Sequence, residues 1–176
     1  MQHAQIGRVA SIALGLSLAI IVAISAALAG YPAHADQDPA KPLYGVWRLT
    51  AFQTQIVGEA APREPFGPHP FGYLILTPEH RMMAYLSKPD RKPAANDAEA
   101  AQLLRSMIAY TGRYRLEGDK FITVVDGAWS EILKANEQVR YFSIAGDKLS
   151  IRTPEQPSGV FPGKRIVSVL TWQREQ

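Results

Sequence analysis

Few side chains in this sequence are of the types that carry out nucleophilic, acid–base or metal chemistry. The 176 residues include no cysteine, which excludes disulfides, thiolate nucleophiles and thiolate metal sites. Of the four histidines, only His69 and His80 follow residue 35, and they have neither H-x-H nor H-E-x-x-H spacing. No G-x-S-x-G motif or phosphate-binding glycine loop is present. We therefore expect no metal and no cofactor, and we favour a binding protein over an enzyme.

Arg140 is the residue best suited to bind a ligand. Period-two alternation along the strand expected there places its side chain on the same face as Phe142. A guanidinium does not lose its proton, and burying it without a partner is costly. Arg140 therefore binds a ligand carboxylate, phosphate or carbonyl, or it pairs internally with Asp126 or Glu131, or it extends its charge to the rim of the fold.

Aromatic side chains with polar tips form a second group of candidates. Such groups orient small molecules in mostly apolar sites, and they equally fill a protein core. With Arg140, the predicted ligand-binding residues are Met83, Tyr85, Tyr114, Thr123, Trp129 and Phe142. An alternative is an isomerase or hydrolase that uses Arg140, Tyr114 and either Asp126 or Glu131.

Strands must position most of these residues, because the sequence between turns alternates apolar and polar side chains with a period of two. One helix is expected at 97–108, since Asn96 can cap it and Glu99 stands at the capping-box position. The predicted strands are 44–53, 71–77, 81–87, 110–117, 120–128, 137–145, 148–153 and 165–174.

Two glycine turns set the register of the second half. Gly118-Asp119 and Gly146-Asp147 predict tight hairpins, and the first of them places Tyr114 opposite Thr123. The resulting sheet has one largely apolar face. Closing eight strands removes exposed edges, so we predict an all-β fold. It is an eight-stranded antiparallel up-and-down β-barrel with one short helix, and a β-sandwich is the alternative.

Composition agrees with one folded domain that does not bind nucleic acid. Hydrophobic residues make up 47% and charged residues 20%, which is typical of a globular chain. The formal net charge of +3 is too small for a nucleic-acid-binding surface.

The N-terminal segment resembles an export signal. No charged residue occurs from 9 to 33, and Ala33-His34-Ala35 fits a signal-peptidase site. We expect cleavage after Ala35, with an uncleaved membrane anchor as the alternative. The remainder then divides into a polar lead-in, 36–43, and a barrel domain, 44–176. The expected location is periplasmic or secreted, with membrane contact only through the N-terminal segment if it is retained.

Five segments, in this order, resemble the bacterial and fungal lipocalin-like domain family. They are GVWRLTAF, PFGYLILTPEHRMMAYL, AYTGRYRLEGDKFITVV, VRYFSIAGDKLSIRTP and VLTWQR, and they cover most of 44–174. The resemblance implies an antiparallel barrel closed by a short helix, with an interior able to hold a ligand. It also implies that Trp47, in the Gly45-x-Trp47 element, packs beneath Arg174 at the barrel base.

The function expected from these observations is an exported, monomeric protein that binds a small hydrophobic ligand, as a carrier or by sequestration. Besides the enzyme, one further alternative is an interaction module. Its proline-rich loop, 62–70, would dock an envelope partner through Phe66 and Phe71.

Overall fold

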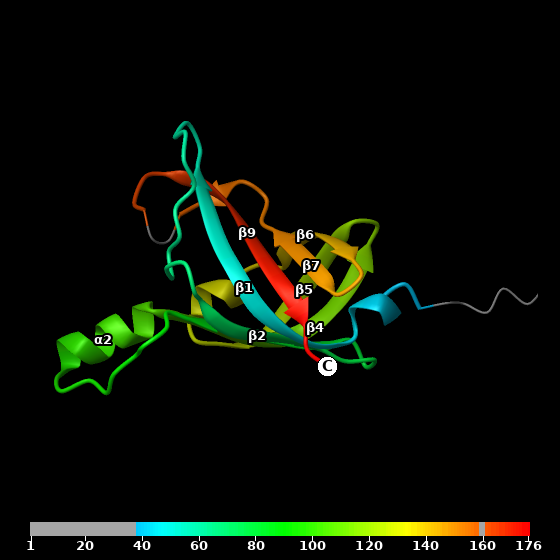
Figure 1. Cartoon of the computed structure of the whole chain (residues 1–176), viewed down its shortest axis with the longest axis horizontal. Helices are drawn as coiled ribbons and strands as arrows, with labels where there is room; N and C mark the ends of the chain where they lie inside the picture. The colour runs from blue at the N-terminus through cyan, green and yellow to red at the C-terminus, as the bar shows by residue number, and fades with distance from the viewer. Residues whose placement is uncertain (1–37, 159–160) are drawn as a thin grey trace, which may run out of the picture. The chain divides into compact units, whose positions relative to one another are not determined.

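A closed barrel forms the described part of the chain. The computed structural model describes residues 38–158 and 161–176, and the predicted signal peptide, 1–35, lies outside them. Successive strands pair antiparallel, and β1 pairs with β9 as well as with β2, which closes the sheet (Figure 1). The eight barrel strands are β1 (Gly45–Ile56), β2 (Phe71–Leu76), β3 (Arg81–Ser87), β4 (Met107–Glu117), β5 (Lys120–Ala128), β6 (Gln138–Ala145), β7 (Lys148–Arg152) and β9 (Arg165–Arg174). The predicted barrel is confirmed, and the sandwich alternative is wrong.

Short elements complete the fold: the helix α2 (Asp97–Arg105), two 3-10 turns, η1 (Lys41–Leu43) and η2 (Glu131–Lys134), and the short strand β8 (Gln156–Pro157). Asn96 caps α2 as predicted, because its side-chain oxygen accepts from the Glu99 amide at 3.0 Å. The helix ends before the predicted residue 108, since β4 begins at Met107. None of its residues is buried and Leu104 is half exposed, so α2 does not close the barrel.

The hairpin registers follow the glycine turns. Gly118 and Gly146 have φ of +60° and +58°, and Tyr114 lies opposite Thr123 as predicted. Alternation along β1 changes phase at an irregularity between Leu49 and Ala51, so that both ends of this long strand direct apolar side chains inward. Among the described residues, no helix is long and apolar enough to span a membrane.

The two ends of the barrel differ in their connections. Because successive strands are antiparallel, alternate connections lie at opposite ends. One end, here called the base, has the start of β1, the end of β9 and the short connections 77–80, 118–119 and 146–147. The other, here called the loop end, has the longer connections 57–70, 88–106, 129–137 and 153–164. Figure 1 shows α2 within one of these longer connections.

Candidate functional site

Trp47 and Arg174 close the base. Trp47 is fully buried, and its Nε1 donates to a backbone carbonyl of η1 at 2.8 Å. The Arg174 guanidinium lies 4.1 Å from the centre of the Trp47 ring and donates to the carbonyls of Pro42 and Tyr44, each at 2.6 Å. Gly45 has a φ of +125°, and a Cβ there would approach Arg174 Nη1 to 3.2 Å. These contacts make Trp47 and Arg174 a structural plug.

A stack of rings fills the interior above this plug. Tyr114 lies 4.7 Å from Phe121 and 5.3 Å from His80, with both pairs of rings nearly parallel. Burial, together with the nearby Asp38 carboxylate, raises the pKa of Tyr114 to about 12. Thr123 is also buried. Tyr114 and Thr123 therefore face the interior as predicted, and they lie in its packed part.

Buried side chains also occupy the loop end. Ile56, Leu86 and Ile166 are almost fully buried there, and Phe66, from the connection after β1, is buried and packs edge-to-face on Phe52 at 5.2 Å. Several interior-facing side chains remain partly exposed, namely Ile108, Tyr110, Leu116, Arg140, Phe142, Ile144 and Leu170. Leu116 and Ile144 lie beside the base turns, so partial exposure is not confined to the loop end.

Arg140 is the charged member of this group. It lies opposite Phe121, on the same face of β6 as Phe142. Its Nη1 donates to the Val139 carbonyl at 2.7 Å and its Nη2 to Gln138 Oε1 at 3.0 Å. No carboxylate in residues 38–158 or 161–176 forms an ion pair with it.

The two acids predicted as alternative partners of Arg140 are engaged elsewhere. Asp126 pairs with Arg81, whose hydrogen bond holds the pKa of the Asp126 carboxyl below its usual range. Glu131 pairs with Lys134 at 2.7 Å, and the side chains of Asp126 and Glu131 are 50% and 78% exposed. The acid–base arrangement of the enzyme alternative is therefore not assembled, because both carboxylates point to solvent.

Two predicted ligand-binding residues lie on the outer face, which is a correction. Met83 is 52% exposed, since Met82 and Ala84 are the residues of β3 that point inward. Tyr85 lies on the same side of β3 as Met83 and accepts a hydrogen bond from Arg91. Met83 and Tyr85 therefore do not line the barrel interior. Trp129 follows the end of β5, donates its amide to the Ala109 carbonyl at 2.8 Å, and has a buried indole Nε1 without a hydrogen-bond partner among the described residues.

The interaction-module alternative needs Phe66 and Phe71 on one exposed loop. The structure separates them, because Phe66 is buried against Phe52 while Phe71, 50% exposed, lies on the outer face beside Tyr73.

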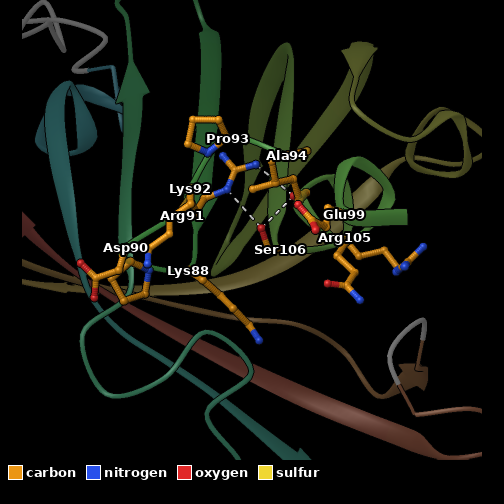
Figure 2. Close-up of a pocket in the computed structure, with 12 residues that line it drawn as sticks. Lys88, Asp90, Arg91, Lys92, Pro93, Ala94, Glu99, Arg105 and Ser106 are labelled. Carbon is orange, nitrogen blue, oxygen red and sulfur yellow. Dashed lines mark hydrogen bonds between the residues drawn. The ribbon is translucent and has the colours of Figure 1, made fainter. Parts of the chain in front are cut away.

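A concavity lies on the surface, between α2 and the segment that follows β3 (Figure 2), and half of its twelve lining residues are charged. Its volume is about 510 Å³. Arg91 donates to Ser106 Oγ at 3.1 Å and to the Leu103 carbonyl at 3.0 Å. Through these hydrogen bonds, Arg91 connects the segment that follows β3 to the C-terminal end of α2. Among the described residues, no cluster of three or more histidine and acidic side chains could hold a metal ion.

Four loop-end residues were missed by the sequence analysis. Ile108 and Tyr110 continue the period-two pattern that contains Gly112, and Gln138 continues the one that contains Arg140. If both alternating patterns are extended to the starts of β4 and β6, they predict that Ile108, Tyr110 and Gln138 face the interior. No local pattern in the sequence indicates that Leu170 faces the interior. Its strand, β9, has no hairpin turn that fixes its register, which is set by pairing with β1 and β7.

Comparison with known proteins adds the family. A family model described as a lipocalin-like domain matches residues 44–175. No curated protein gives a significant match to the chain.

Proposed function

Because the chain belongs to the lipocalin-like domain family, we propose that it binds a small hydrophobic molecule inside the loop end of its barrel. The carrying observation is that Tyr110, Phe142 and Leu170 face the interior of a closed barrel and yet remain partly exposed. An eight-stranded barrel is wide enough to hold one small ligand.

The lining favours an elongated apolar ligand. Ile108, Tyr110, Phe142 and Leu170 offer apolar contact from four different strands. Each methylene that leaves water contributes about 0.8 kcal/mol, before the cost of immobilising the ligand. A chain of about ten methylenes therefore contributes about 8 kcal/mol, which is the free energy of micromolar binding before that cost is subtracted.

We further propose that the protein is exported and acts as a carrier or sequestering protein, as a monomer. The uncharged stretch from 9 to 33 and the Ala33-His34-Ala35 site support export. The absence of an assembled acid–base group around Arg140, within the described residues, favours carriage over catalysis.

Titration with a neutral apolar probe, N-phenyl-1-naphthylamine, tests the binding proposal. We expect micromolar affinity, and we expect Leu170→Trp to weaken it about tenfold by filling the interior. Val124→Trp is the matched control, because Val124 is 51% exposed on the outer face. Equal affinity in both variants would place the probe elsewhere and contradict the proposal.

Native mass spectrometry of protein purified from its own host tests for a natural ligand. A bound small molecule that organic extraction removes would support the proposal. An empty wild-type protein that also fails to bind the neutral probe would refute it.

A further inference from the structure

We propose that the ligand carries a monoanionic head group, such as a carboxylate, and that Arg140 binds it. This inference rests on the proposed function and specifies the chemistry of the same site. The geometry that carries it is a partly buried guanidinium on the interior face, held in position by neutral acceptors and free of any carboxylate among the described residues.

Arg140 is held rather than mobile. Its two terminal nitrogens are bonded to the Val139 carbonyl and to Gln138 Oε1. The Gln138 amide is itself anchored, since its Nε2 donates to the carbonyls of Leu133 at 2.9 Å and Asn136 at 3.0 Å. These bonds to the η2 connection orient the Gln138 oxygen towards the guanidinium. The remaining N–H donors of Arg140 are therefore presented in a defined direction, which lowers the entropic cost of binding an anion.

The charge of Arg140 is not balanced within the described part of the chain. Three acids of β5 and of the connection between β5 and β6 pair with another cation: Asp126 with Arg81, Glu131 with Lys134, and Glu137 with Arg115 at 2.7 Å. A guanidinium cannot become neutral, so partial burial without an anion costs free energy. A bound monoanion removes that cost and forms charge-assisted hydrogen bonds.

The surroundings of Arg140 define the rest of the ligand. Phe142, which is partly exposed, lies two residues along the same face of β6 and has no polar group, while Phe121, across from Arg140 on β5, is buried in the stack with Tyr114. One charged group among apolar side chains fits an amphiphile whose head is a single oxyanion and whose tail is a hydrocarbon chain. A monoanion matches the single positive charge.

The experiment compares dodecanoate, dodecanol and methyl dodecanoate by isothermal titration of the full chain at neutral pH. The three probes share one tail and differ in the head. We expect dodecanoate to bind at least about tenfold more tightly than either neutral probe. Equal affinities would overturn the anionic head group and leave the proposed function intact. Failure of all three to bind would overturn both.

Two variants test whether Arg140 causes the preference for dodecanoate over the neutral probes. Arg140→Met is expected to remove the preference for dodecanoate while dodecanol still binds, and Gln138→Glu is expected to do the same by giving Arg140 an internal carboxylate. Arg113→Met is the matched control, because Arg113 is exposed on the outer face of β4. A preference for dodecanoate that survives in both Arg140→Met and Gln138→Glu would overturn the assignment to Arg140.

Discussion

The base and the loop end are built from the same eight strands, but different contacts occupy the barrel interior at the two ends. At the base, short turns bring the strands together, and Trp47, Arg174 and the Tyr114 stack fill the space between them. At the loop end, the connections are longer, Phe66 and Thr153 are buried within them, and Arg140 has no carboxylate partner in the described chain. The base is thus held by ring packing and by a balanced arginine, whereas the loop end contains an arginine whose charge no described carboxylate balances.

The largest expected effect contrasts the two ends directly. Trp47→Ala should lower the free energy of unfolding by about 3–5 kcal/mol, because it removes a fully buried indole from the base. Phe142→Ala should cost only about 1–2 kcal/mol, since Phe142 already contacts solvent. Guanidinium denaturation measures both, and Trp47→Phe gives a milder variant if Trp47→Ala does not fold. Equal costs for Trp47→Ala and Phe142→Ala would contradict the difference between the ends.

Phe66→Ala tests whether the covered side of the loop end limits ligand exchange. We expect a loss of about 2–3 kcal/mol of stability, because Phe66 is buried against Phe52. Stopped-flow fluorescence should show faster release of N-phenyl-1-naphthylamine. Phe71→Ala, at a half-exposed aromatic on the outer face, is the control and should leave the release rate unchanged. An unchanged rate in Phe66→Ala would mean that the ligand leaves by another side.

The base should also respond to alkaline pH. Burial raises the pKa of Tyr114 to about 12, so the folded protein keeps a proton that the unfolded chain loses from about pH 10. The stabilisation is therefore complete below pH 10 and is lost as pH rises towards 12, by up to about 2–3 kcal/mol. Denaturation midpoints at pH 9 and pH 11 measure it. Tyr114→Phe should show a smaller fall than the wild type, and an equal fall would exclude Tyr114 as the cause.

The smallest expected effects compare two arginines. Arg174→Met should lower stability by about 1–2 kcal/mol, because Arg174 covers Trp47 and bonds to two carbonyls. Arg140→Met should change stability by less than about 0.5 kcal/mol or raise it, since it removes an unbalanced, partly buried charge. Thermal unfolding of the two variants without ligand checks both. A large loss in Arg140→Met would mean that Arg140 serves the fold rather than a ligand.

Sequence reasoning predicted the barrel, the hairpin registers and the helix cap, and it predicted the interior positions of Tyr114, Thr123, Arg140 and Phe142. These follow from alternation and turn glycines, which act over a few residues. It misplaced Met83 and Tyr85, which were chosen for side-chain type rather than for their position in the alternation.

Alternation and the turn glycines determine which side chains share a face, because a strand exposes its residues with a period of two whatever lies beyond it. The sequence by itself therefore determined the strands, their hairpins and most of the interior face. Only the tertiary structure decided which interior side chains are completely buried. Burial depends on contacts across the closed barrel, such as Arg174 over Trp47, Phe66 on Phe52 and the pairing of β1 with β9. The partners in these contacts are far apart in the chain or belong to connections without a periodic pattern.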